Sequence, residues 1–236
     1  MDLTAKFPGL AGELLLCRGC LGLVGTGAEA GLCARCWEGL APLPEDRCPR
    51  CALQHGEDRD CPEPVAWGLG TALWDYHAGR PPFGELLLPG IKAGERGWMK
   101  ALLGRAAIAP LPDWIAEVDL IVPVPTTPWR RFRRGFDLAD AFARLVAERL
   151  HTPCLKALRK AWRAPSQTGR PESQRRRLPQ KAIEVRDPEV LKGSTLLLVD
   201  DVWTTGTTLL RCAQALQKAG AKEIRVLTLF RAMRGV

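Results

Sequence analysis

Two adjacent carboxylates and a threonine-rich loop follow one short apolar segment near the C-terminal end of the sequence. Residues 196–199 are apolar and predict a buried strand, and Asp200 and Asp201 come directly after them. Helical periodicity over 209–219 predicts a helix that ends before Gly220. Unpaired backbone N–H groups at a helix start attract phosphate. The sequence therefore predicts that the acidic pair binds a ribose, whose 5-phosphate is bound by Thr204, Thr205, Gly206, Thr207 and Thr208.

The loop 204–208, called the phosphate cradle below, combines four hydroxyl groups with one central glycine. Gly206 allows a positive φ or the close approach of a ligand. An ordinary strand end with a threonine-rich helix cap is the alternative interpretation. The order of strand, acidic pair, loop and helix favours the ribose 5-phosphate site.

A second loop of similar character follows another predicted strand, at 119–125, which ends in proline. The loop leads into an amphipathic helix predicted over 138–150. Strands that alternate with helices, up to a final strand at 223–230, predict an α/β fold with a parallel sheet. Loops that follow parallel strands meet at the carboxyl edge of the sheet, so both loops are expected to bind one phosphorylated sugar. The candidate ligand-binding residues of the second loop are Thr126, Thr127 and Arg134.

Positive charge is concentrated in residues 129–177, which carry twelve arginines and two lysines against four acidic residues. This stretch has a net charge of +10, while the whole chain has +8. Such a concentration indicates an anionic partner, a phosphate compound or nucleic acid, and a solvated arginine-rich surface is the alternative. Trp129 and Trp162 lie beside arginines and could stack on bases, although packing is the more ordinary role. The predicted nucleic-acid contacts are Arg130, Arg131, Arg133, Arg170, Arg176 and Arg177.

A long basic loop with few apolar residues is predicted over 160–180. A mobile loop of this kind, closing over a reactive pyrophosphate, would exclude water. Arg175 is its candidate ligand-binding residue.

Seven of the nine cysteines fall within the first 61 residues. The first four form two Cys-x-x-Cys pairs separated by a glycine-rich segment, which is the spacing of a tetrahedral zinc site with four thiolates. Two pairs in tandem argue against a redox-active dithiol. The predicted structural zinc ligands are Cys17, Cys20, Cys33 and Cys36.

The second cysteine group is incomplete, because its last expected cysteine is replaced by proline. His55 lies between its members and is the preferred fourth ligand, ahead of Asp58 and Asp60. A group that holds no metal is the alternative. The second candidate zinc ligands are Cys48, Cys51, Cys61 and His55.

The 236 residues, 46% of them hydrophobic, are enough for a large core with a small module. The apolar runs are too short to span a membrane, and the first twenty residues lack the features of a signal peptide, so we expect a cytoplasmic protein. Three segments are predicted: a cysteine module at 1–64, a connector and hood at 65–118, and a phosphate-binding core at 119–236.

The connector shows weak patterning. Trp67, Trp74 and Tyr76 predict packing on a short strand or hairpin, and a helical stretch follows residue 94 and extends to 107. Lys92 either faces the cleft or is an ordinary surface lysine, and the second interpretation is the simpler one.

The acidic pair and the phosphate cradle resemble the motif with which type I phosphoribosyltransferases bind phosphoribosyl pyrophosphate (PRPP). Nearly the whole chain resembles the ComF family of competence proteins. Besides the cysteine pairs and the cradle, the resemblance is carried by Val122-Pro-Val-Pro125, Arg134-Gly135-Phe136, Gln167-Thr168-Gly169 and Arg175. Asp137 stands where the family usually has asparagine, and Leu178 aligns with another expected asparagine.

The resemblance implies a type I phosphoribosyltransferase-like domain with a zinc ribbon, and a role in bringing single-stranded DNA inward during natural transformation. Other DNA-uptake proteins would be partners. The alternative is an active phosphoribosyltransferase that binds PRPP with Mg²⁺ on Asp200 and Asp201 and releases pyrophosphate. A third hypothesis is a regulator that senses PRPP or a nucleotide without turnover.

Overall fold

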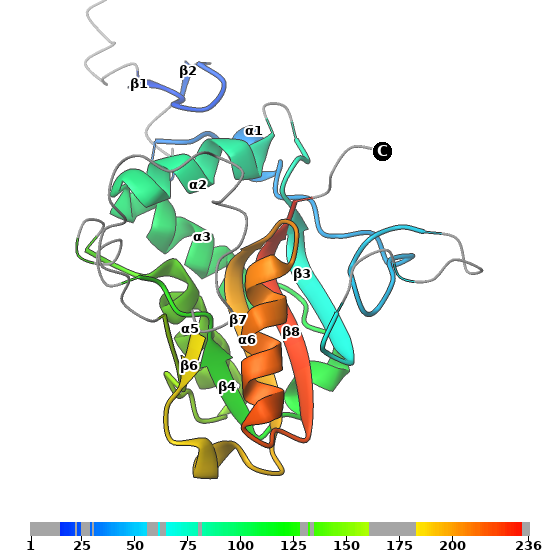
Figure 1. Ribbon diagram of the computed structural model, residues 1–236. Coiled ribbons are helices and arrows are strands. Elements are labelled where there is room, and N and C mark those ends of the chain that lie inside the picture. The colour runs from blue at the N-terminus through cyan, green and yellow to red at the C-terminus, as the bar shows by residue number, and fades with distance from the viewer. Residues whose placement is uncertain are drawn as a thin grey trace, which may run out of the picture.

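Four parallel strands form the central sheet (Figure 1). In the computed structural model they lie in the order β3 (Leu69–Asp75), β8 (Glu223–Arg231), β7 (Thr195–Trp203) and β4 (Leu120–Pro123). Each neighbouring pair is parallel, which confirms the predicted α/β fold. The structure describes residues 15–21, 23–24, 29, 31–55, 61, 65–79, 82–127, 132, 135–160 and 183–232.

Helices cover both faces of this sheet, because side chains of β7 alternate between two cores. Leu197 and Val199 pack in the core that includes α2, α3 and α5. Leu196 and Leu198 pack in the core that includes α6. The helices are α2 (Phe83–Ala93), α3 (Arg96–Ile108), α5 (Leu138–Leu150) and α6 (Thr207–Lys218).

Three of these helices occur where the sequence predicts them. α5 has the predicted bounds, α3 is the helical stretch expected up to 107, and α6 begins two residues earlier than predicted. The sequence did not predict α2, since it contains Pro89 and Gly90, which are both unfavourable inside a helix. A Cβ at Gly90 would lie 2.4 Å from the ring of Trp98, so this glycine allows α2 and α3 to pack closely.

The strand that carries the acidic pair is longer than predicted. The sequence indicated that it ends at residue 199, with the carboxylates beyond its end. In the structure β7 continues to Trp203, because Asp200 pairs with Thr228 and Val202 pairs with Phe230 of β8. The acidic pair is therefore held on the ladder of the central sheet rather than on a free loop.

The connector also contributes to this sheet. β3 pairs with β8 along its length, where the sequence predicted only a short strand or hairpin. The boundaries between the three predicted segments remain a prediction. The smaller elements are β1 (Leu15–Leu16), β2 (Leu23–Val24), α1 (Ala34–Trp37), η2 (Asp113–Ala116), β5 (Leu158–Lys160), β6 (Ile183–Val185) and η5 (Pro188–Leu191).

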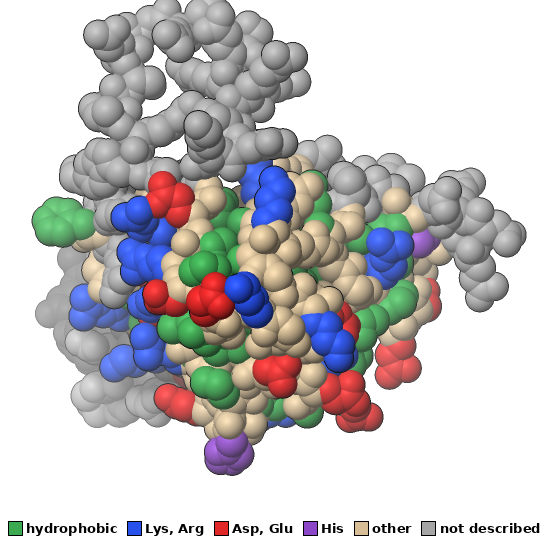
Figure 2. All heavy atoms as spheres, turned by 60° about the horizontal axis from the view of Figure 1, so that its bottom comes forward, with side chains coloured by type: hydrophobic (Ala, Val, Ile, Leu, Met, Phe, Trp, Pro, Cys, Tyr) green, Lys and Arg blue, Asp and Glu red, His purple; other side chains and the backbone are tan. Residues whose placement is uncertain are grey.

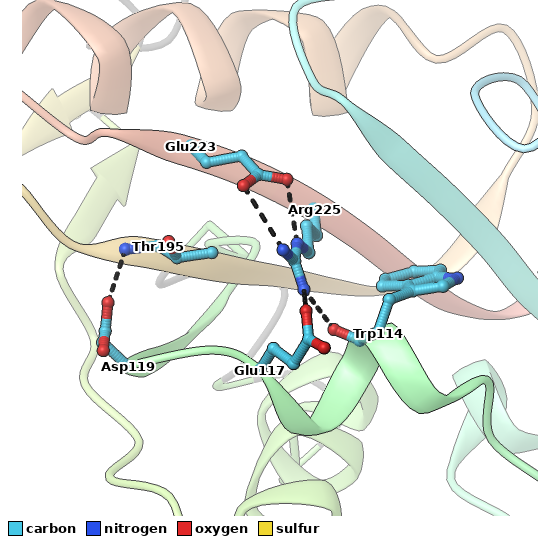
Figure 3. A network of polar contacts seen from close by, with 6 residues as sticks. All are labelled: Trp114, Glu117, Asp119, Thr195, Glu223 and Arg225. Atoms are coloured by element: carbon cyan, nitrogen blue, oxygen red, sulfur yellow. Dashed lines mark hydrogen bonds and ion pairs between the residues drawn. The ribbon is translucent and has the colours of Figure 1, made fainter.

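A buried arginine fixes the segment before β4 to the sheet (Figure 3). The Arg225 guanidinium lies 2.9 Å from Glu223 Oε1 and 3.4 Å from Glu117 Oε2, and it donates to the carbonyl of Trp114. Its hydrogen bonds to charged groups compensate for the loss of hydration at a residue that is 9% exposed. The Arg225 network therefore holds the start of β4 in register.

The face of the molecule seen in Figure 2 carries acidic and basic side chains interspersed with apolar ones. Because the charges are mixed, the described part of that face has no electrostatic potential of one sign. Among the helices that the structure describes, none has the length and apolar character needed to cross a bilayer.

Candidate functional site

The loop after β4 lies beside the C-terminal part of β7 at the carboxyl edge of the sheet, as the parallel arrangement predicts. A small cavity of about 20 Å³ there is lined by Thr126 from the first loop and by Asp200 and Asp201 from β7. Lys92, Phe136 and Asp137 also line it. The structure thus brings Thr126 and the acidic pair together, and Thr127 is the half-buried neighbour of Thr126.

Lys92 reaches this cavity from α2, so the simpler interpretation of it as a surface lysine is wrong. Its Nζ lies 3.5 Å from Asp201 Oδ2, and 38% of its side chain is exposed. The sequence left this placement open as one of two interpretations, because α2 itself was not predicted. The ion pair places a cation beside the acidic pair.

The two carboxylates differ in environment. Burial, followed by the negative charge of Asp201, raises the pKa of Asp200 well above its ordinary value. The Asp201 backbone N–H donates to Asp200 Oδ1 at 2.9 Å, which partly offsets this effect. The charged forms of two neighbouring carboxylates are unfavourable when buried. Hydrogen bonds donated by the hydroxyls of a sugar would stabilise these charged forms.

Asp137 lies at the same cavity and begins α5. Its Oδ1 accepts a hydrogen bond from the backbone N–H of Asp140 at 3.4 Å, which makes Asp137 the N-cap. Burial, with further repulsion from Asp140 and Asp201, raises the pKa of Asp137. The capping role explains why either aspartate or asparagine fits this position, whereas only aspartate adds a third negative charge to the cavity.

The phosphate cradle has the backbone expected of an anion site at the start of α6. Gly206 has φ 67°, the first of the two possibilities that the glycine allows, and it is the N-cap of the helix. Gly206 is buried, while all four threonines of the cradle are exposed. The hydroxyls of Thr205 and Thr207 lie 2.9 Å apart. The exposed threonines therefore stand at the start of a twelve-residue helix, where a phosphate could bind.

A larger cavity of about 200 Å³ adjoins the first one and shares Thr126 and Asp137 with it. The basic side chains that line it come from the segment before β5, from β5 itself and from the residue after β6. Sequence reasoning counted three of them in the net charge but assigned a role to none. These residues are Lys156, Arg159, Lys160 and Arg186.

Two of these basic residues already have acidic partners. Lys156 Nζ lies 2.8 Å from Asp140 Oδ2, and Arg159 pairs with Glu184 across the β5–β6 hairpin. For Lys160 and Arg186 no ion pair is found within the described part of the chain. The cavity therefore offers positive charge for an anionic group close to the acidic pair.

Several predicted site residues lie outside the described residues. They include both tryptophans proposed to stack on bases and most of the basic loop predicted over 160–180, and they are Trp129, Arg130, Arg131, Arg133, Arg134, Trp162, Arg170, Arg175, Arg176 and Arg177. Their roles in ligand and nucleic-acid binding remain predictions.

The first cysteine cluster consists of Cys17, Cys20, Cys33 and Cys36, whose sulfurs all lie within 4.8 Å of one another. The Cys17–Cys36 and Cys20–Cys33 sulfur distances are 3.5 and 3.7 Å. Two Zn–S bonds of about 2.3 Å at the tetrahedral angle span nearly the same distance. The four thiols therefore fit a tetrahedral metal ion.

Hydrogen bonds in the first cluster also favour a bound thiolate. Backbone N–H groups of Gly19 and Cys33 donate to Cys17 Sγ at 3.4 and 3.3 Å. Burial raises the pKa of Cys17, but backbone hydrogen bonds outweigh burial and lower this pKa to about 6. A thiolate with such donors is typical of a cysteine metal ligand.

The second cysteine cluster consists of Cys48, Cys51, His55 and Cys61, with ligand atoms within 4.8 Å of one another. The backbone N–H of Arg50 donates to Cys48 Sγ at 3.4 Å, as in the first cluster. The geometry places His55 where the missing fourth cysteine would be expected, whereas Asp58 and Asp60 lie outside the described residues. Both clusters could hold a metal ion.

Comparison with known proteins gives a family context for this arrangement. A family model described as phosphoribosyl transferase domain matches residues 133–236. The DNA utilization protein YhgH of Escherichia coli O157:H7 is 28% identical over 86% of this chain and 91% of its own length. Competence protein F of Haemophilus influenzae is 27% identical over 92% of this chain and 95% of its own length.

Among solved structures, a glutamine PRPP amidotransferase from B. subtilis shares 22% identity over 56% of this chain and 26% of its own, with a TM-score of 0.38. That similarity is too distant to add to the assignment of the site. The cysteine clusters, the order of the elements and the relatives that align over most of their own length agree with one another. The chain is therefore similar over most of its length to DNA utilization protein YhgH and to competence protein F, and its C-terminal part matches the phosphoribosyl transferase domain.

Proposed function

We propose that this protein assists the uptake of single-stranded DNA in natural transformation and binds PRPP or another phosphoribosyl group at the carboxyl edge of its sheet. The observation that carries the proposal is the placement of Thr126, Asp200 and Asp201 around one cavity, directly before the exposed hydroxyls of the phosphate cradle. The names of the relatives, DNA utilization protein and competence protein, support the biological role.

In this proposal each part of the ligand has its own partner. The ribose hydroxyls donate to Asp200 and Asp201, and the 5-phosphate accepts from the cradle hydroxyls and the N–H groups at the start of α6. A pyrophosphate, or a neighbouring phosphate of a nucleic acid, extends toward Lys160 and Arg186 in the larger cavity. Mg²⁺ would enter with PRPP, for which the carboxylates are suitable oxygen ligands.

The ligand needs a rearrangement at Lys92. The cavity of about 20 Å³ holds no more than one water-sized group, which is far less than a ribose. Breaking the Lys92–Asp201 contact would open the ribose end, and the freed ammonium could then pair with a phosphate oxygen of the ligand. The ion pair is half-exposed, so its loss costs at most about 1 kcal/mol.

A calorimetric titration with PRPP and Mg²⁺ tests the phosphoribosyl part of the proposal. The native protein should bind, and the double variant Asp200→Asn/Asp201→Asn should lose binding by at least about tenfold. Equal binding by both proteins, or no binding by the native one, would exclude the assigned site.

Binding of a fluorescent single-stranded oligonucleotide tests the DNA part. The affinity should fall steeply as salt is raised, because Lys and Arg side chains displace counterions from phosphates. Lys160→Met/Arg186→Met should bind more weakly and with a smaller salt dependence, while the exposed pair variant Lys100→Met/Lys218→Met should bind nearly as the native protein does. The DNA role is wrong if the native protein shows no binding at low salt.

The second candidate function is an active phosphoribosyltransferase. It is favoured by the match of a phosphoribosyl transferase domain model to residues 133–236. A nucleophile would form a bond to the ribose anomeric carbon as the bond to pyrophosphate breaks, with catalysis by positioning and charge stabilisation. Pyrophosphate release in the presence of candidate nucleobases measures this reaction, and a protein that binds PRPP without releasing pyrophosphate is a binding protein only.

A further inference from the structure

Arg231, at the end of β8, is a buried cation that contacts two functional regions at once. Its side chain is 1% exposed. Nε donates to the backbone carbonyl of Cys51, in the second cysteine cluster, at 3.0 Å. Nη1 donates to the carbonyls of Trp203 and Thr204, at 3.0 and 2.5 Å. One guanidinium therefore joins the Cys48–Cys51 turn to the first residue of the phosphate cradle.

Aromatic packing strengthens this junction. The Arg231 guanidinium carbon lies 4.4 Å from the centre of the Trp203 ring, in cation–π geometry. Trp203 in turn packs edge to face on Trp67 at 5.3 Å, and Trp67 Nε1 donates to the carbonyl of Arg50 at 2.8 Å. The Cys48–Cys51 turn thus supports β7 immediately before the cradle through a second, independent route.

Backbone contacts make a third route from the second cluster. The N–H of Gly70, on β3, donates to the carbonyl of Pro49 at 2.7 Å. A Cβ at Gly70 would lie 2.9 Å from the Arg50 carbonyl oxygen and 3.1 Å from the Trp203 ring. No larger residue than glycine fits between the cysteine turn and the tryptophan, so these elements are in direct contact.

The first cysteine cluster has different neighbours. Cys17 and Cys36 belong to the core that contains Phe83 and Leu87 of α2. A Cβ at Gly19 would lie 2.9 Å from the Leu86 side chain, so the first cluster packs closely on α2. The two clusters therefore support different parts of the protein, α2 in the first case and the strand end before the cradle in the second.

We propose that the second cluster, when it holds its metal, orders the phosphate cradle through Arg231, which acts as a positioning residue. The metal ligands Cys48 and Cys51 fix the turn that presents the Cys51 carbonyl. Loss of the metal would displace that carbonyl and break its hydrogen bond with Arg231. The Arg231 side chain would then be less ordered, and its hydrogen bonds to the carbonyls of Trp203 and Thr204 would weaken. The coupling itself is independent of the ligand, whereas its effect on phosphate binding rests on the proposed function.

Hydrogen exchange with mass spectrometry tests the coupling without any ligand. Cys48→Ser in the second cluster is compared with Cys33→Ser in the first, since both residues are half-buried. In Cys48→Ser the peptide 202–206 should exchange about tenfold faster, while in Cys33→Ser only peptides around α1 and α2 should change. Metal content by native mass spectrometry shows that each variant has lost the intended ion.

A second variant, Arg231→Lys, separates the arginine from the metal. It keeps the charge, but a single ammonium nitrogen cannot take the places of both Nε and Nη1, so exchange of 202–206 should rise while metal content stays the same. Ribose 5-phosphate should bind to it about tenfold more weakly. If Arg231→Lys does not fold, Cys48→Ser alone decides the outcome.

The coupling is wrong if Cys48→Ser loses its metal and the exchange of 202–206 is unchanged, or if Cys33→Ser accelerates that peptide equally. Failure of the native protein to bind ribose 5-phosphate would instead exclude the proposed ligand and leave the exchange result intact.

Discussion

Lys92 Nζ on α2 lies 3.5 Å from Asp201 Oδ2 on β7, so a helix that precedes the phosphoribosyltransferase domain match contributes a cation to the acidic pair. The contact joins the helical layer to the carboxyl edge of the sheet.

Removal of this cation should weaken ligand binding. In Lys92→Met the anionic phosphates lose a nearby positive charge, so PRPP binding measured by calorimetry should weaken by about tenfold. Lys100→Met is the matched control, because Lys100 is exposed on α3 and its substitution removes the same charge. Equal losses in both variants would mean that only the net charge matters.

Asp137→Asn should stabilise the protein at neutral pH. Burial raises the pKa of Asp137, so the folded state retains its proton to higher pH than the unfolded state, and stability falls as pH rises above about 4 toward the raised value. Asparagine keeps the N-cap without the charge. Urea unfolding should show a gain of about 0.5–2 kcal/mol at pH 7 that disappears at or below about pH 4.

The exposed residue Asp113 supplies the control for that experiment. Asp113→Asn should change the free energy of unfolding by no more than about 0.5 kcal/mol. A gain for Asp137→Asn that is the same at both pH values would show that charge burial is not its cause.

Gly206→Ala should lower both stability and phosphate binding. Alanine at φ 67° is strained by about 1 kcal/mol, and relief of that strain would displace the cradle threonines. Gly104→Ala, in the middle of α3 with open space around the added Cβ, should instead stabilise by about 0.5–1 kcal/mol. Thermal unfolding and ribose 5-phosphate binding measure the two effects, and unchanged binding in a destabilised Gly206→Ala would remove the cradle from the site.

His55→Ala should remove one metal ion. Elemental analysis should find two zinc ions per native chain, and one in the variant, because three thiols alone hold zinc weakly. His77→Ala is the control, as His77 lies at the surface beside Glu85 and should leave both ions in place. One zinc ion in the native protein would mean that the second cluster holds no zinc.

Local patterns in the sequence were sufficient for the phosphate cradle, the first cysteine cluster and α5. The Thr-rich loop, the Cys-x-x-Cys spacing and the 138–150 periodicity each depend on neighbouring residues and backbone preferences, which a sequence displays directly. The family resemblance rested on the same short motifs and on their order along the chain.

Only the tertiary structure decided where Lys92, Lys160, Arg186 and Arg231 lie. Their positions depend on packing between distant segments: α2 is stabilised by its apolar face despite Pro89, and β7 extends to Trp203 because β8 pairs with it. The Cys51–Arg231 contact joins residues 180 positions apart. Long-range contacts of this kind leave no periodic signal in a single sequence, because burial and hydrogen bonding across the fold, rather than local preference, select those residues.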